Sequence, residues 1–137
     1  MKITIVGAGY VGLSLGTLMA QYHEVAALEI DEKKIEKINN RISPIEDKDI
    51  NSFFKKKKLN IYATSDKPLA YKDSDFIVVC TPTNYDSNTN EFDTSTVRSV
   101  IHEAIKYNSK SECIIVIKST IPVGHTKLLQ EKFKTNR

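Results

Sequence analysis

The stretch KITIVGAGYVGLSLGTLMAQYHEVAALEID, residues 2–31, decides the fold. Its composition predicts a short β-strand at Lys2–Val6, a glycine-rich turn, a helix over Tyr10–Tyr22 and a second strand over Glu24–Ile30. A strand that runs into G-x-G-x-x-G and a helix, with an acidic residue where the next strand ends, is typical of a dinucleotide-binding βαβ unit. The stretch therefore predicts a site for the pyrophosphate of a dinucleotide.

Three glycines give this turn its expected role. Gly7 allows the tight turn, Gly9 leaves room for the pyrophosphate to approach the backbone, and Gly12 lets the helix pack closely on the strand. We expect the free N–H groups near Tyr10 and Val11 to face the phosphates, because a helix N-terminus attracts anions. The alternative is a tight strand-to-helix turn without a ligand, but all three glycines and both flanking segments match the binding pattern.

Acidic residues at the end of the second strand indicate which dinucleotide binds. We favour Glu29 as the acceptor of hydrogen bonds from both hydroxyls of the adenosine ribose, and Asp31 as the N-cap of the following helix. A carboxylate at this place repels a 2′-phosphate, so the prediction is NAD in preference to NADP. Lys33, Lys34 and Arg41 weaken that preference, since a nearby cation can accept the phosphate.

The rest of the chain alternates strands and helices. We predict strands over 59–63, 75–80 and 112–117, helices over 31–40, 47–57, 66–71, 94–107 and from about 124 onward, and a polar loop over 81–93. This alternation predicts an α/β fold of the Rossmann type, a doubly wound parallel sheet of about five strands in the order 3-2-1-4-5 with helices on both faces. The apolar cores of the last two strands are typical of burial on both faces. Large apolar residues predict the buried face of the first helix: Val11, Leu15, Leu18, Met19 and Tyr22.

Composition narrows the possible partners. The 137 residues fit one domain, and 20 basic against 17 acidic residues give a net charge of only +3, which favours neither nucleic acid nor an anionic membrane as a partner. No stretch approaches the roughly 20 apolar residues of a membrane span. Cys80 and Cys113 lie in apolar runs, so we interpret them as inert buried thiols of a cytoplasmic protein. His23, His102 and His125 lack partners at metal-site spacing, so we expect them on the surface and expect no metal.

Polar segments follow the fourth and fifth predicted strands, TPTN at 81–84 and KSTIP at 118–122. In an open parallel sheet, ligands lie beyond the carboxyl ends of the strands. We therefore expect Thr81, Pro82, Thr83 and Asn84, together with 118–122, to face the cofactor and contact its nicotinamide half. Ordinary turn chemistry, with a proline ending each strand, explains these residues equally well.

Four motifs in order carry a resemblance to a known family. They are GAGYVGL at 7–13, TPTNY at 81–85, FD at 92–93 and KSTIPVG at 118–124. Together they resemble the UDP-glucose/GDP-mannose dehydrogenase family, and the similarity runs along the whole chain. The resemblance implies contacts with NAD from Val11, Glu29, Lys34, Thr83 and Thr120. It also implies that Thr120, the one expected catalytic residue here, lies near the reacting carbon. The family usually has aspartate at position 29, where Glu29 keeps the charge on a longer side chain.

The reaction of that family implies a larger protein. Its members oxidise the C6 alcohol of a nucleotide sugar to a carboxylate, with two NAD and a covalent thiohemiacetal on a cysteine. No residue here matches that cysteine or the family's catalytic lysine and glutamates. The resemblance therefore implies that residues 1–137 are an NAD-binding domain without the central helical and C-terminal substrate domains, which binds NAD without turnover. It also implies a nucleotide-sugar substrate and a homo-oligomer for the full-length enzyme.

Other functions fit part of the sequence. The NAD-binding domain of a β-hydroxyacid or hydroxyacyl dehydrogenase shares the glycine turn but leaves the TPTNY segment unexplained. A non-catalytic nucleotide-sensing module would use the same turn without any chemistry. A methyltransferase that uses S-adenosylmethionine fits less well, because its turn does not need the third glycine.

Overall fold

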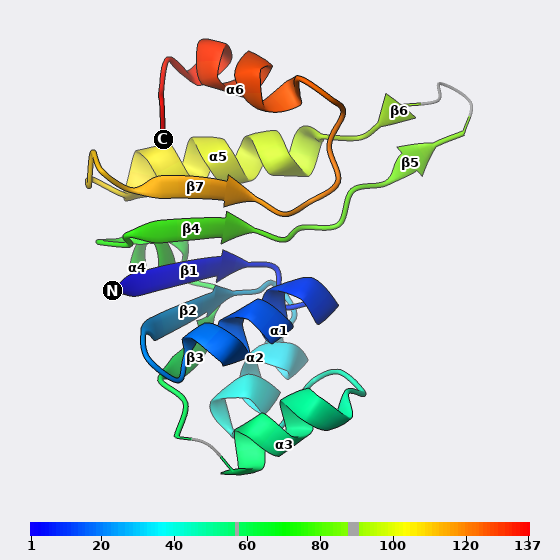
Figure 1. Cartoon of the computed structure of the whole chain (residues 1–137), viewed down its shortest axis with the longest axis vertical. Helices are drawn as coiled ribbons and strands as arrows, with labels where there is room; N and C mark the ends of the chain where they lie inside the picture. Colours follow the sequence, from blue (N-terminus) through cyan, green and yellow to red (C-terminus); the bar gives the residue numbers. More distant parts are fainter. Residues whose placement is uncertain (57, 88–90) are drawn as a thin grey trace.

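The computed structural model describes residues 1–56, 58–87 and 91–137, with a five-stranded parallel sheet at its centre (Figure 1). The strands are β1 (Lys2–Val6), β2 (Glu24–Leu28), β3 (Ile61–Thr64), β4 (Phe76–Val79) and β7 (Ile114–Ile117). They lie in the order β3-β2-β1-β4-β7, and all four pairings are parallel. The predicted order 3-2-1-4-5 of a doubly wound α/β fold is confirmed.

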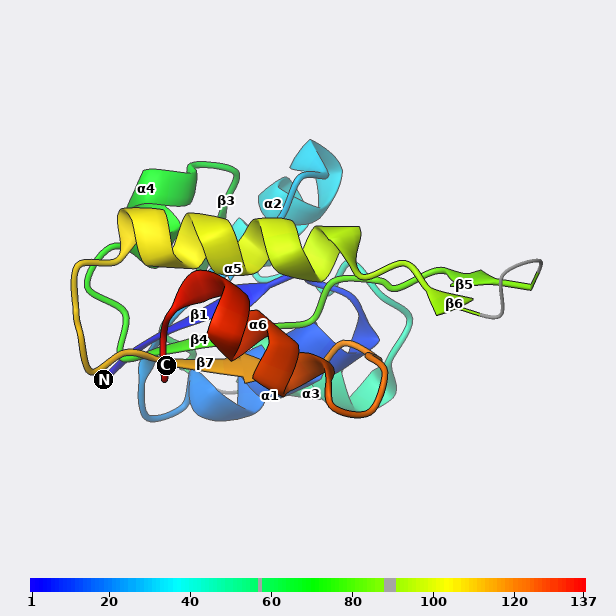
Figure 2. The same ribbon diagram turned by 90° about the horizontal axis from the view of Figure 1, so that it is seen from above.

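Helices cover both faces of the sheet. One apolar cluster includes residues of α1 (Tyr10–Met19), α2 (Glu32–Asn39) and α3 (Lys48–Lys56), and the other includes residues of α4 (Lys67–Tyr71), α5 (Ser95–Tyr107) and α6 (His125–Phe133). Figures 1 and 2 show α5 and α6 on the face opposite α1 and α3. Alternate residues of β2 point to opposite faces of the sheet. Val25 and Ala27 belong to the first cluster, and Ala26 and Leu28 belong to the second. The strands therefore point side chains into both layers, as buried parallel strands do.

Helix α1 packs on the sheet through small residues. Its buried residues are Gly12, Leu13, Gly16 and Thr17. The predicted buried face is wrong for Val11, Leu18 and Tyr22, which are exposed, while Leu15 and Met19 pack partly buried against the core. Small side chains let the helix lie close to the strands: a Cβ on Gly16 would be 3.5 Å from Ile5 and 3.6 Å from Val25.

Strand β7 lies at an edge of the sheet and is less buried than predicted. Among the described residues it pairs only with β4, and its Ile114 is 48% exposed. Burial is confirmed for β4, where Ile77, Val78 and Val79 are all buried. The prediction fails for β7 because an edge strand has a neighbouring strand on one side only.

Part of the predicted loop over 81–93 forms a short antiparallel hairpin. Strands β5 (Tyr85–Asp86) and β6 (Glu91–Phe92) pair, and the ring centroids of Tyr85 and Phe92 are 5.1 Å apart. Figures 1 and 2 show this hairpin projecting beyond the sheet. Residues 88–90 lie outside the described residues, as does Lys57, the predicted end of the third helix. Helices α1 and α6 are shorter than predicted and end at Met19 and Phe133.

Candidate functional site

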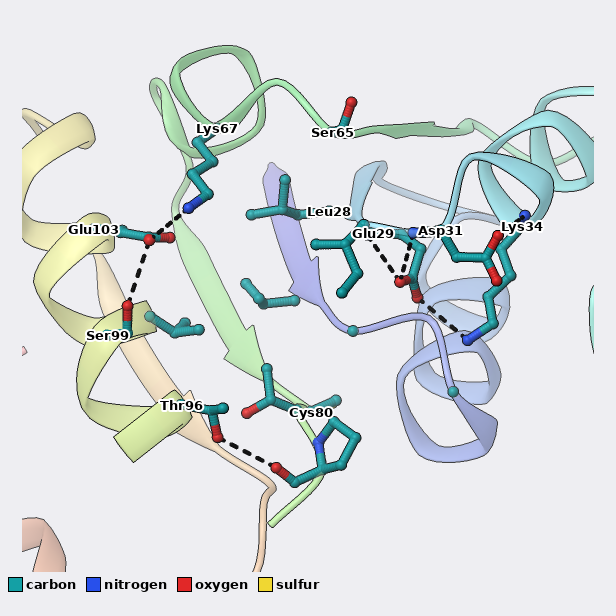
Figure 3. Close-up of a pocket in the computed structure, with 17 residues that line it drawn as sticks. Leu28, Glu29, Asp31, Lys34, Ser65, Lys67, Cys80, Thr96, Ser99 and Glu103 are labelled. Atoms are coloured by element: carbon teal, nitrogen blue, oxygen red, sulfur yellow. Dashed lines mark hydrogen bonds and ion pairs between the residues drawn. The ribbon is translucent and has the colours of Figure 1, made fainter. Parts of the chain in front are cut away.

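A cavity of about 580 Å³ opens at the carboxyl ends of β1, β2 and β4 (Figure 3). Six of the residues predicted for the cofactor line it: Gly7, Gly9, Glu29, Lys34, Thr81 and Pro82. The other five are not among its lining residues. Gly12 is buried under the glycine turn, Tyr10, Val11 and Thr120 are exposed, and Thr83 is partly buried. The structure thus brings the turn, the end of β2 and the end of β4 to one cavity.

The geometry of the turn requires two of its glycines. Gly7 has φ of +96°, and a Cβ there would lie 2.8 Å from the carbonyl oxygen of Cys80. A Cβ on Gly12 would lie 2.0 Å from the carbonyl oxygen of Gly7. By contrast, a Cβ on Gly9 would meet no atom within 4 Å. Gly7 and Gly12 therefore build the turn, and Gly9 leaves open space above it.

The start of α1 has backbone donors without helical partners. The first hydrogen bond of the helix runs from the Leu13 N–H group to the Gly9 carbonyl oxygen at 2.9 Å. The N–H groups of Tyr10, Val11 and Gly12 therefore have no acceptor within the helix. No side chain from the described residues caps this helix. Three donors and the positive end of the helix dipole, beside open space over Gly9, form an arrangement suited to an anion such as a pyrophosphate.

Glu29 lies directly after β2, and its carboxylate binds the glycine turn to the start of the next segment. It is 8% exposed and accepts hydrogen bonds from the backbone N–H groups of Ala8 (3.0 Å), Ile30 (2.8 Å) and Asp31 (3.2 Å). The Lys34 Nζ lies 3.7 Å from the Oε2 atom of Glu29. Because a carboxylate offers about four acceptor positions, these three bonds leave Glu29 one position for a ribose hydroxyl.

Asp31 caps helix α2. Its Oδ1 atom accepts hydrogen bonds from the backbone N–H groups of Lys33 (2.9 Å) and Lys34 (3.4 Å). This cap holds Lys34 beside Glu29, as Figure 3 shows. The predicted division of roles between the two acidic residues is therefore consistent with the geometry, with Asp31 at the helix start and Glu29 turned to the cavity.

Two loops meet beyond the ends of β4 and β7. The Ser119 Oγ donates to the carbonyl oxygen of Thr81 at 2.7 Å and lies 3.3 Å from the Thr81 Oγ1. The Thr96 hydroxyl of α5 donates to the Pro82 carbonyl oxygen at 3.2 Å. These bonds hold the TPTN and KSTIP segments together at the edge of the sheet where the cavity opens.

The surroundings of the two cysteines do not activate them as nucleophiles. Burial raises the pKa of the Cys80 thiol, against a smaller opposing effect of Lys118, and burial also raises the pKa of Cys113. Both thiols are unpaired, and Cys80 lines the cavity as a protonated group. Only His102 is fully on the surface as predicted, while His23 and His125 are partly buried. Within 1–56, 58–87 and 91–137, no group of three or more His, Cys, Asp or Glu could hold a metal ion, and no helix could cross a membrane.

Sequence reasoning missed one side of the cavity. Ser65 and Lys67 come from the segment after β3, and Thr96, Ser99 and Glu103 come from α5 (Figure 3). The α5 residues are spaced i, i+3 and i+7, so they share one helical face. In the sequence, this row of polar residues opposite the apolar face of the same helix is the pattern that could have indicated the second side of the cavity.

Relatives of known identity match along the whole chain. The model of the UDP-glucose/GDP-mannose dehydrogenase family, NAD binding domain, matches residues 1–137. The UDP-glucose 6-dehydrogenase of Streptococcus pneumoniae is 50% identical over 137 residues, which are 100% of this chain and 34% of that protein. That of Campylobacter jejuni is 46% identical over 135 residues, 97% of this chain and 34% of that protein. The chain thus spans about a third of the length of these curated relatives.

A solved structure agrees with this match. The GDP-mannose dehydrogenase of Pseudomonas aeruginosa, in a ternary complex, superposes with a TM-score of 0.81 and 28% identity, over 96% of this chain and 32% of that one. The family match decides against the alternative of a β-hydroxyacid or hydroxyacyl dehydrogenase. From the glycine turn, the strand order and these similarities together, we conclude that the chain belongs to the UDP-glucose/GDP-mannose dehydrogenase family and corresponds to its NAD-binding domain.

Proposed function

We propose that the cavity holds NAD with its pyrophosphate over Gly7 and Gly9. The observation that carries this proposal is the open space over Gly9, which lies at an uncapped helix start and joins the cavity that Glu29 lines. The N–H groups of Tyr10, Val11 and Gly12 donate to the phosphate oxygens. When bound, NAD supplies the acceptor for a hydride.

Glu29 and Lys34 share the adenosine ribose in this proposal. Glu29 has one acceptor position left for a hydroxyl, and Lys34, which lies 3.7 Å from it, donates to the other. The nicotinamide half lies towards Thr81, Pro82, Thr83 and the exposed Thr120. The hydrogen bond from Ser119 to the Thr81 carbonyl oxygen supports this placement, because it joins the loop after β4 to the loop after β7.

The same site predicts a preference for NAD over NADP. We expect NADP to bind at least about tenfold more weakly, a difference of about 1.4 kcal/mol, because its 2′-phosphate meets the Glu29 carboxylate. Glu29→Gln removes that charge and should narrow the gap, mainly by improving the affinity for NADP. Calorimetric titration of the unmodified chain and of Glu29→Gln with NAD and with NADP measures the ratio of the two affinities.

Glu32→Gln is the matched control for this experiment. Glu32 is exposed on α2 and does not line the cavity, so the control makes the same change in net charge outside the site. It should leave the ratio unchanged. Equal affinity of the unmodified chain for NAD and NADP would refute the assigned role of Glu29.

We further propose that this domain serves an enzyme that oxidises UDP-glucose to UDP-glucuronate with two NAD. The support is the name of the curated relatives, UDP-glucose 6-dehydrogenase, at 50% and 46% identity. In that enzyme residues 1–137 are the NAD-binding domain, Thr120 lies near the reacting carbon, and other domains supply the nucleophile and the binding site for the nucleotide sugar. We place the enzyme in the cytoplasm as a homo-oligomer, and the two unpaired thiols support a reducing compartment.

Residues 1–137 alone should bind NAD without turnover. A mixture of this chain, UDP-glucose and NAD is expected to form no NADH, because the cysteine nucleophile of the family has no counterpart here. NADH absorbance over time measures this directly. Steady formation of NADH that depends on UDP-glucose would contradict the proposed division of labour between domains.

A further inference from the structure

The NAD cavity has a second polar end, which the family assignment does not explain. There the Lys67 Nζ of α4 lies 2.7 Å from the Glu103 Oε1 of α5, and the Ser99 Oγ lies 3.5 Å from the same oxygen. Figure 3 shows these side chains across the cavity from Glu29 and Lys34. The pair joins two helices at the wall of the cavity, so the cavity has polar groups at both ends.

The wall between the two ends is apolar. Leu28 and Val100 line it, together with Val6 and Ile30. Apolar walls with a few polar groups at defined places are typical of sites that bind a flat ring and fix its orientation. With the ribose at Glu29, the part of the dinucleotide that extends from the ribose along these walls is the adenine base.

We propose that Glu103, positioned by Lys67, recognises the amino group of the adenine; this inference rests on the proposed NAD site. The edge of adenine presents a 6-amino donor beside a ring nitrogen acceptor. Glu103 is the more buried partner, since its side chain is 19% exposed against 47% for Lys67. Lys67 and Ser99 occupy two of the roughly four acceptor positions of the carboxylate, and the Tyr71 hydroxyl lies beside it, which leaves at least one position for an N–H donor of the ligand.

An ionised carboxylate accepts hydrogen bonds and cannot donate them. Hypoxanthine carries an oxygen where adenine carries the amino group, so the Glu103 oxygens would face another acceptor. Glutamine at the same position can turn its amide and offer either an oxygen or an N–H group. Glu103 therefore selects an amino base, and Glu103→Gln should accept both bases.

The test compares NAD with nicotinamide hypoxanthine dinucleotide, whose base carries a carbonyl oxygen in place of the 6-amino group and a proton on the neighbouring N1 atom. We expect the unmodified chain to bind NAD about tenfold more tightly, as the loss of a hydrogen bond to a charged group implies. In Glu103→Gln the ratio should fall to about one, chiefly because the hypoxanthine cofactor binds better. Glu131→Gln, the same substitution at an exposed position of α6 outside the cavity, should keep the unmodified ratio.

The outcomes separate this inference from the cofactor site itself. Equal affinity of the unmodified chain for the two dinucleotides overturns the role of Glu103, and so does a ratio that Glu103→Gln leaves unchanged. The first comparison needs no substitution, so the inference stays testable even where the variant does not fold. Binding of neither dinucleotide would instead refute the NAD site as a whole.

Discussion

Gly12→Ala is expected to destabilise the chain by about 3 kcal/mol or more, at the upper end of what overpacking usually costs. The added Cβ would lie 2.0 Å from the carbonyl oxygen of Gly7 and 3.0 Å from a methyl carbon of Ile5. Neither neighbour can move freely, because the Gly7 oxygen is part of the turn and Ile5 is in the central strand. A loss of this size is a large fraction of the 5–15 kcal/mol that stabilises a typical domain. Urea denaturation followed by circular dichroism measures it.

Gly16→Ala is the matched control, one helical turn further along α1. A Cβ at Gly16 would lie 3.5–3.6 Å from its nearest neighbours, which is ordinary van der Waals contact. We expect this variant to be as stable as the unmodified chain or more stable by about 0.5–1 kcal/mol, because alanine favours a helix interior over glycine. Equal stability of Gly12→Ala and Gly16→Ala would contradict the described contact between α1 and the turn.

Gly9→Ala is expected to abolish most of the affinity for NAD while the fold remains intact. The new methyl group would meet no protein atom within 4 Å, and the backbone φ of −81° suits any residue. It would, however, occupy the space through which the pyrophosphate reaches the N–H groups of α1. We expect affinity to fall about a hundredfold, or about 2.8 kcal/mol, with a change in stability within about 1 kcal/mol for the altered N-cap.

Titration of the Gly9→Ala variant with NAD, next to its urea denaturation, checks both parts of this prediction. The pair Gly9→Ala and Gly12→Ala then separates two effects that a single glycine variant would mix. One blocks the ligand and spares the fold, and the other disturbs the fold. Wild-type affinity for NAD in Gly9→Ala would show that the pyrophosphate lies elsewhere.

Much of the fold could be predicted from the sequence because each local signal agrees with the next. The turn at Gly7–Gly12, the acidic residue after β2 and the alternation of strands and helices determine the strand order together. The buried face of α1 could not be predicted from its large apolar residues, since the helix rests on Gly12 and Gly16. The spacing of large apolar side chains does not reveal a helix face that packs through glycines.

The candidate site was predictable where a residue lies next to a strand end and less so elsewhere. Glu29 and Thr81 follow β2 and β4 directly, and both line the cavity. Glu103 and Lys67 come from helices, and only the crossing of α4 and α5 brings them together. The hydrogen bonds that limit Glu29 to one further donor likewise depend on the folded turn, because Ala8 is 21 residues away.

A titration of the chain with NAD, followed residue by residue through the backbone amide signals in NMR spectra, tests the central claim most directly. We expect saturable binding of one NAD per chain, with the largest shifts at Gly7, Gly9, Val11 and Glu29 and smaller ones along the α5 face that carries Ser99 and Glu103. Little change is expected at Lys110 and Asp75, because their ion pair lies before the amino ends of β4 and β7, whereas the cavity lies at the carboxyl ends of the strands. No shift at millimolar NAD, or shifts confined to residues outside the cavity, would contradict the claim that this turn binds the cofactor.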